Sequence, residues 1–462
     1  MRHPRRTATT TTLLTAAGLV AALGLAAPAT ADPAPARVPA QATTPPDPGG
    51  EGEHSDTATG TIPPFAPPAR IDAAPELDGT ARAVSALPAS GLPARLTSRS
   101  TSMLPAFSGS VVDASTGSSI WTRQSTTALR PGSTMKLLTA TTAMRTLGTR
   151  HHFVTPVLRG GSRGDHVYLK GVGDPTLNSF RLDKMAASAA YQLKKAGVRT
   201  VSLRVDDTLF PAPTNAPGWE RSDVGQWVTP VRALAYDGRM EQDSTMDTGR
   251  RFRAELVSRG ITVRDLHRGR TVPGARQIAA GSSPELRRIV GDMLRVSHND
   301  YAEKLLWASA MKAGAPRTWA GVTAHSRSQV AHYGVSTSGG VLADGSGLSR
   351  SNRLTSRTLT QLVLALHRHS IMRPVVFGSA SMPVAGRTGT LEKRFGTAPA
   401  SCAVDRVRAK TGSLRDAGAM AGIATGIDGR RRVFAVISNG QPYDADLRAR
   451  IDRLVATTTL CM

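Results

Sequence analysis

A serine and a lysine stand three residues apart near position 133, a spacing that can turn a hydroxyl into a nucleophile. A serine attacks a carbonyl only when a base removes its proton, and a lysine can be that base if its surroundings keep it neutral. In Ser133-Thr134-Met135-Lys136 both side chains would share one helical face, since positions i and i+3 are neighbours there. We therefore interpret Ser133 as a candidate nucleophile and Lys136 as its general base.

The surrounding sequence predicts the helix that would hold this pair. Pro131-Gly132 interrupts the preceding segment, and an apolar stripe with helical spacing then runs to Gly148. Ser133 would lie in the first turn, where free N–H groups and the helix dipole favour a developing negative charge. The same spacing recurs in residues 309–312, but late in another expected helix, so we interpret that copy as ordinary helix surface.

A second polar motif, Ser297-His298-Asn299, lies between two expected helices. One helix is expected to start at residues 283–285 and the next at Asp300, with Glu303 as its capping-box partner. Such a turn can direct a hydroxyl that shuttles a proton and an amide that holds a substrate into one cleft. The alternative is that Ser297 and Asn299 only cap helix ends.

A third motif, Lys410-Thr411-Gly412-Ser413, follows strand-like residues and precedes a small-residue segment, 418–425. Together these stretches are expected to form two edge strands. A strand lysine beside a glycine leaves room for a substrate backbone and offers a cation to its carboxylate. The stretch Arg387-Thr388-Gly389-Thr390 competes for this role, but charged residues follow it, so we favour Lys410.

The three motifs in this order resemble those of the D-alanyl-D-alanine carboxypeptidase/endopeptidase family, the low-molecular-mass class C penicillin-binding proteins of DacB type. The stretches 173–177 and 344–350 resemble further family signatures, and the likeness runs from about Phe107 to the C-terminus. The resemblance implies an α/β (α+β) fold. In it, an antiparallel sheet with flanking helices forms a penicillin-binding/β-lactamase-like transpeptidase domain, split by a smaller inserted domain.

The resemblance also implies roles for the motif residues. Ser133 would attack the carbonyl of the penultimate D-alanine of a peptidoglycan stem peptide, with Lys136 as base. Ser297 would pass the proton to the departing amine, and Asn299 would orient the peptide. The substrate carboxylate would bind at Lys410, Thr411, Gly412 and Ser413, with the N–H groups of Ser133 and Ser413 as the oxyanion hole. β-Lactam antibiotics would act as inhibitors by acylating Ser133.

The organisation of the 462-residue chain follows from composition and motif positions. Residues 1–31 have a basic start, an apolar stretch and a small-residue cleavage site, which indicates a secretory signal peptide. Residues 32–100, rich in Pro and Ala, are expected to be a disordered linker. The peptidase domain is expected at 101–158 and 281–462, and the inserted domain at 159–280.

The two halves of the peptidase domain are expected to share one sheet. Strand-like residues 109–112 and 120–121 would pair with residues 420–425 and 433–438 near the C-terminus. No later segment has the length and apolar composition of a transmembrane span. We therefore expect no transmembrane span in the mature chain, and a secreted, extracytoplasmic protein associated with the cell wall.

The chain has two cysteines, Cys402 and Cys461. In an exported protein an even pair permits a disulfide, which would hold the last helix against the sheet. The alternative is two unrelated buried thiols.

Charge and composition bear on partners and cofactors. The formal net charge is +24, but the basic residues are scattered and only 4% of residues are aromatic, which argues against nucleic-acid binding. The cationic surface is either simply solvated or attracted to anionic wall polymers.

Neither His151-His152 nor His367-Arg368-His369 has the spacing of a zinc site, so we expect no metal and no cofactor.

Two other functions use the same residues. A serine β-lactamase would share the motifs but release its acyl group quickly, and a catalytically silent relative would only bind the wall. The complete motif set favours a peptidase over both.

Overall fold

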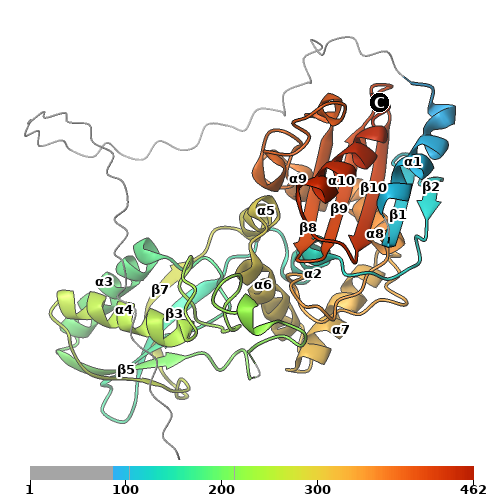
Figure 1. Ribbon diagram of the computed structural model, residues 1–462. Coiled ribbons are helices and arrows are strands. Elements are labelled where there is room, and N and C mark those ends of the chain that lie inside the picture. Colours follow the sequence, from blue (N-terminus) through green and yellow to red (C-terminus); the bar gives the residue numbers. More distant parts are fainter. Residues whose placement is uncertain (1–86, 104, 213) are drawn as a thin grey trace, which may run out of the picture. The chain divides into compact units, whose positions relative to one another are not determined.

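The computed structural model describes residues 87–103, 105–212 and 214–462, which form two five-stranded sheets (Figure 1). The expected signal peptide, 1–31, and most of the expected linker lie outside these residues. One sheet combines strands from both ends of the described chain, and the other is built from its middle part.

The first sheet has the strand order β2-β1-β10-β9-β8, and every neighbouring pair is antiparallel. This confirms that strands near residue 110 pair with C-terminal strands. Strand β8 is at an edge of the sheet but β9 is interior, so the expectation of two edge strands was wrong for β9. The bounds are β1 Ala106–Asp113, β2 Ser119–Arg123, β8 Val407–Leu414, β9 Ala417–Thr425 and β10 Arg431–Asn439.

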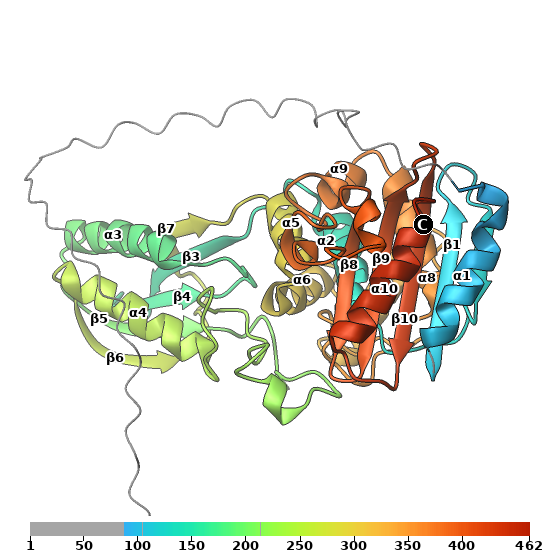
Figure 2. The ribbon, with the colours of Figure 1, turned by 45° about the horizontal axis from the view of Figure 1, so that its top comes forward.

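Helices cover both faces of this sheet (Figure 2). Successive strand residues point to opposite faces, and in β9 Ala421 joins the apolar core with α2 and α8, whereas Met420 joins the core with α1 and α10. Because neither face meets solvent, β9 and β10 are buried almost throughout and lack polar alternation. The bounds are α1 Leu92–Ser100, α2 Lys136–Leu147, α8 Ser356–Arg368 and α10 Ala445–Thr457.

Helix α1 corrects the expected linker, which had been extended to residue 100. Leu92 and Leu96 are four residues apart, so they lie on one face of α1, and both are buried against the sheet. Trp121 Nε1 donates to Thr97 Oγ1 at 3.0 Å and joins α1 to β2. Tertiary packing of two leucines therefore stabilises a helix in a stretch whose composition suggested an unstructured tether.

The second sheet has the order β6-β5-β4-β3-β7, with parallel pairs only at β4–β5 and β5–β6. Strands β3 and β7 pair with each other from Val154↔Ser282 onward, so the sheet extends beyond the expected 159–280 at both ends. Helices α3 and α4 supply much of its core. The bounds are β3 Val154–Gly160, β4 His166–Lys170, β5 Thr200–Asp206, β6 Thr262–Arg268, β7 Arg276–Ser282, α3 Ser179–Lys195 and α4 Ser244–Ser258.

Four more helices complete the peptidase part. Helices α5 and α6 flank the turn at residues 297–298, as the sequence predicted. In the described part of the chain, no helix is long and apolar enough to cross a bilayer. The bounds are α5 Leu286–Val296, α6 Asn299–Lys312, α7 Trp319–Ala331 and α9 Met372–Phe377, and short 3₁₀ turns span Ala89–Gly91, Thr101–Met103, Gly132–Met135, Arg221–Asp223, Gly389–Leu391 and Ala400–Ala403.

The expected disulfide between Cys402 and Cys461 is present in the structure, with a Cα–Cα distance of 5.9 Å. It links the segment before β8 to the C-terminus, just beyond α10. Cys461 lies in the apolar core that α10 forms with the sheet. The bond therefore ties the last helix to the strand that carries Lys410.

We predict that the double substitution Cys402→Ala and Cys461→Ala lowers the free energy of unfolding by about 2–4 kcal/mol. The reason is that the unfolded chain regains the freedom that a cross-link between residues 59 positions apart removes. Urea denaturation measures the change, and wild-type protein in reductant should fall to the same stability. An unchanged midpoint in the double variant would contradict the prediction.

Candidate active site

Ser133 and Lys136 face each other across one 3₁₀ turn. Residues Gly132–Met135 form the turn, and Lys136 begins α2. Side chains at i and i+3 of a 3₁₀ helix eclipse each other, so Lys136 Nζ lies only 3.0 Å from Ser133 Oγ. The local backbone thus holds the hydroxyl and the amine in hydrogen-bond contact.

Three oxygen atoms surround the Lys136 amine, and the residue has no exposed surface. Besides Ser133 Oγ, Nζ contacts Asn299 Oδ1 and the carbonyl oxygen of Ser346, each at 2.7 Å. Two of the three partners can only accept a hydrogen bond, whereas the hydroxyl can also donate one. A neutral amine therefore satisfies all three contacts by donating twice and receiving the serine proton on its lone pair.

Burial lowers the pKa of Lys136 to about 7, while the carboxyl groups of Asp344, Glu303 and Asp300 oppose this shift. Desolvation wins because a charged amine without water is disfavoured. A large fraction of Lys136 is then neutral near pH ~7, which is the state a general base requires.

The turn between α5 and α6 supplies the second motif. Ser297 has a φ of 62°, in the left-handed region that few non-glycine residues adopt, and this reverses the chain after α5. Asn299 is the first residue of α6 and bonds Lys136, while its Nδ2 donates to the carbonyl oxygen of Trp227 at 2.8 Å. Ser297 is partly exposed beside it. The Asn299 amide is thus fixed at both ends.

The third motif lies on the edge strand β8, beside the turn that carries Ser133. A Cβ at Gly412 would lie 2.3 Å from the carbonyl oxygen of Pro131 and 3.2 Å from the amide nitrogen of Ser133, so only glycine allows this approach. Ser413 is exposed. The backbone of residues 412–413 therefore runs directly past Ser133.

Lys410 is fully buried, and its Nζ donates to the carbonyl oxygen of Thr411 at 2.8 Å. Burial lowers the pKa of Lys410 well below its usual value, and the charge of Lys136 lowers it further. The Thr411 hydroxyl contacts Thr390 Oγ1 at 2.8 Å. The competing residue Arg387 instead pairs with Asp405 through two 2.8 Å hydrogen bonds at the surface.

Glu303 has a different place from the one the sequence suggested. It is not a capping-box partner: it is fully buried and accepts the N–H groups of Gly345 and Ser346 at 2.9 and 2.7 Å. Burial, with Asp344 nearby, raises its pKa to about 8. Since the Ser346 carbonyl accepts from Lys136, Glu303 holds the backbone on the N-terminal side of a residue that contacts the lysine amine. The sequence held one sign of this position: Glu303 is four residues after Asn299, so the two side chains lie on the same face of α6.

The inserted region reaches this site through residues 217–229. Trp219 Nε1 donates to Asp344 Oδ2 at 2.9 Å, and Thr229 Oγ1 donates to Asp300 Oδ1 at 2.5 Å. The carbonyl oxygen of Trp227 accepts from Asn299, which in turn bonds the Lys136 amine. This segment therefore contacts one direct partner of the lysine and two carboxyl groups that act on its pKa. Sequence reasoning found no residue here, because these contacts use a backbone carbonyl, a tryptophan indole and a threonine hydroxyl that no motif marks.

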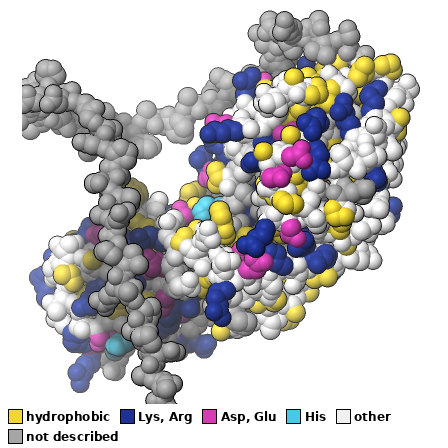
Figure 3. Space-filling view, in the orientation of Figure 1, with side chains coloured by type: hydrophobic (Ala, Val, Ile, Leu, Met, Phe, Trp, Pro, Cys, Tyr) yellow, Lys and Arg dark blue, Asp and Glu magenta, His cyan; other side chains and the backbone are white. Residues whose placement is uncertain are grey.

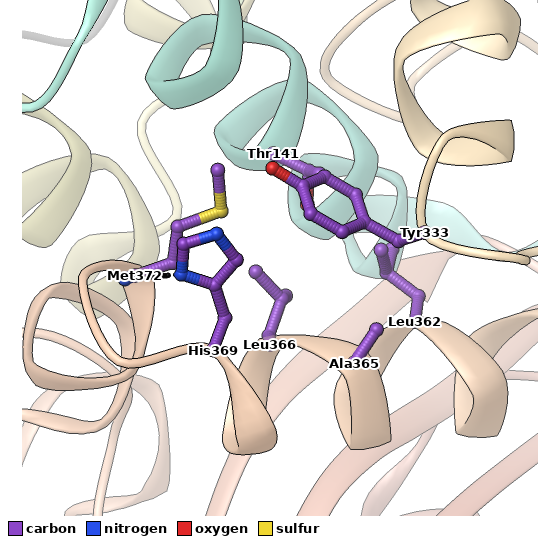
Figure 4. Close-up of a pocket in the computed structure, with 7 residues that line it drawn as sticks. All are labelled: Thr141, Tyr333, Leu362, Ala365, Leu366, His369 and Met372. Carbon is purple, nitrogen blue, oxygen red and sulfur yellow. Dashed lines mark hydrogen bonds between the residues drawn. The ribbon is translucent and has the colours of Figure 1, made fainter.

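Other features singled out by the sequence lie apart from the motifs. Ser309 is not on the helix surface as expected: it is buried, and its hydroxyl bonds the carbonyl oxygen of Leu305. His369 lines a small, mainly apolar hollow with residues of α2 and α8 (Figure 4). No group of three or more His, Cys, Asp or Glu residues within the described ranges could hold a metal ion.

The sequence matches the D-Ala-D-Ala carboxypeptidase 3 (S13) family over residues 98–242 and 238–460. The chain belongs to this family. Carboxypeptidase DacB of Mycolicibacterium smegmatis is 32% identical over 442 residues, covering 89% of this chain and 92% of the relative. D-alanyl-D-alanine carboxypeptidase of an Actinomadura species is 30% identical, covering 74% of this chain and 80% of the relative.

The fold is also that of a known structure. Penicillin binding protein 4 (dacB) from Haemophilus influenzae aligns with a TM-score of 0.67 at 19% identity, covering 79% of this chain and 99% of that protein. The fold class expected from the sequence, a DacB-type penicillin-binding domain with mixed α/β structure, is thereby confirmed.

We predict that the rate at which Ser133 reacts with a β-lactam rises with pH through a midpoint of about 7, the pKa of Lys136. Only the neutral amine can take the serine proton, so the rate should fall about tenfold per unit of pH below that midpoint. Stopped-flow measurements with a fluorescent penicillin would record the profile. A rate independent of pH across this range would exclude Lys136 as the base.

We predict that Glu303→Gln slows this reaction about tenfold or more. Glutamine offers one oxygen to two N–H groups, so the backbone next to the Ser346 carbonyl is held less firmly. The matched control is Glu255→Gln on α4, which should leave the rate unchanged. Reaction of the folded Glu303→Gln variant at the wild-type rate would show that Glu303 does not position Lys136.

Proposed function

We propose that this protein is an exported D-Ala-D-Ala carboxypeptidase that cleaves peptidoglycan stem peptides through an acyl-enzyme at Ser133. The observation that carries the proposal is the contact of Ser133 Oγ with a buried lysine amine whose other partners can only accept. Membership of a serine carboxypeptidase family supports the same reaction class.

In the first step Ser133 Oγ bonds to the carbonyl carbon of the penultimate D-alanine as Lys136 takes the hydroxyl proton. The carbon–nitrogen bond to the last D-alanine then breaks, and the proton passes through Ser297 to the departing amine. The N–H groups of Ser133 and Ser413 stabilise the oxyanion. The close approach of the Ser133 amide nitrogen to Gly412 supports this pairing of donors.

Substrate would lie along β8 from Thr411 to Ser413, as an added strand. The preceding part of this edge already pairs with residues 383–385. Thr411 and Ser413 would bind its carboxylate, while the buried Lys410 contributes positive potential when protonated. Asn299 would hold the peptide amide and keep the lysine in place. Water then releases the acyl group, and the same steps on a cross-linked peptide give endopeptidase activity.

Penicillins would acylate Ser133 because their amide occupies the place of the D-Ala-D-Ala bond. The Haemophilus influenzae protein of the same fold has been crystallised with a β-lactam. Export and association with the cell wall are supported by the signal-like residues 1–31 and by the disulfide, a bond typical of oxidising compartments.

The test is mass spectrometry of the protein after incubation with penicillin. Wild type should gain the mass of one penicillin, and Ser133→Ala should gain none while still folding. Ser309→Ala, which carries the decoy spacing, should be acylated like wild type. Labelling of Ser133→Ala would overturn the proposal.

A second measurement separates the alternatives. D-alanine release from a pentapeptide, with slow nitrocefin turnover, would support the peptidase. Rapid steady nitrocefin hydrolysis would favour a β-lactamase. Failure of wild type to react with either compound would indicate a silent wall-binding relative.

A further inference from the structure

Three arginines from α1 and α10 converge on a polar cavity far from the motifs in the fold. The cavity has a volume of about 100 Å³, and its lining residues are Ser98, Arg99, Ser102, Arg450 and Arg453. The two helices lie next to each other on one face of the first sheet, whereas α2, which carries Lys136, covers the opposite face (Figure 2). The sheet therefore separates this cavity from the reaction site.

Carboxyl groups do not balance the charge around the cavity. Arg450 pairs with Asp446 at 2.9 Å and also donates to the carbonyl oxygen of Ser102 and to Gln441 Oε1, yet its Nε is buried without a hydrogen-bond partner. Within the described residues, the guanidinium groups of Arg99 and Arg453 have no ion pair or hydrogen bond. Burial lowers the pKa of Arg99, and the charges of Arg453 and Arg95 lower it further, which shows that these cations repel one another.

Two buried arginines elsewhere in the protein are arranged differently. Arg394 is held by Asp452 at 2.6 Å and Arg432 by Asp428 at 2.6 Å. Figure 3, drawn in the orientation of Figure 1, shows basic side chains both beside acidic ones and apart from them. With a net charge of +24 many cations lack an acidic partner, so the α1–α10 group is distinguished by the way its guanidinium groups line one cavity.

We propose that this cavity, the α1–α10 arginine cavity, binds a single phosphate-type oxyanion. Guanidinium groups donate in a planar fork that matches phosphate oxygens, and the hydroxyl of Ser98 adds a donor, whereas that of Ser102 donates to the carbonyl oxygen of Arg99. The cavity volume of about 100 Å³ is enough to admit one such group. A bound anion would relieve the repulsion and give the exported enzyme a contact with phosphate-bearing polymers.

The first experiment is a ³¹P NMR titration of the full chain with inorganic phosphate, at ionic strength held constant with NaCl. Saturable line broadening is expected for wild type. The double variant Arg99→Gln/Arg453→Gln should bind at least about tenfold more weakly, because it loses two charge-assisted donors. The control Arg163→Gln/Arg270→Gln removes the same charge from exposed positions of the inserted region and should bind like wild type.

Penicillin acylation at the wild-type rate in both double variants would show that they are folded. Absence of saturable binding by wild type, or equal loss in the two double variants, would overturn the proposal.

A second titration compares poly(glycerol phosphate) with phosphatidylglycerol vesicles. If Arg99→Gln/Arg453→Gln loses binding to the polymer and the control double variant does not, the bound phosphate group belongs to a polymer phosphodiester. If Arg99→Gln/Arg453→Gln loses binding only to the vesicles, the bound group is a lipid headgroup.

Discussion

The burial of one lysine amine is the constraint on which the arrangement of this protein depends. Lys136 lies beyond the reach of water, so its three hydrogen-bond positions must be filled by protein oxygens. Those oxygens come from the turn before α2, from the start of α6 and from the loop at Ser346. The same burial lowers the pKa of Lys136 to about 7, so the packing that costs desolvation energy also favours the neutral amine.

The supports of this lysine extend outward in two directions. Glu303 fixes the Ser346 peptide from within the peptidase part, through two backbone N–H groups. Residues 217–229 of the inserted region bond Asn299, Asp300 and Asp344. The inserted region is thus physically part of the site, because it orients side chains that touch or surround the amine. This explains how a segment without a motif of its own can matter to the chemistry.

The first sheet organises the molecule by separating two surfaces. One face carries α2 and α8, and the edge strand β8 brings Gly412 and Ser413 against the nucleophile. The other carries α1 and α10, where arginines gather around a cavity. The disulfide between Cys402 and Cys461 joins the segment before β8 to the end of the chain after α10. A single core therefore stabilises both the motif strand and the helix pair behind it.

Four features could be predicted from the order of residues: the three motifs, the strands that close the first sheet, the turn at Ser297 and a possible disulfide. Spacing, apolar periodicity and cysteine number are enough for such predictions. Folding was needed to show that Glu303 faces inward, that Leu92 and Leu96 make a helix, that β9 is interior, and that Trp227 orients Asn299. These outcomes depend on partners distant in sequence. The free energy of a buried polar group is set by the atoms that surround it after folding, and no local pattern records them.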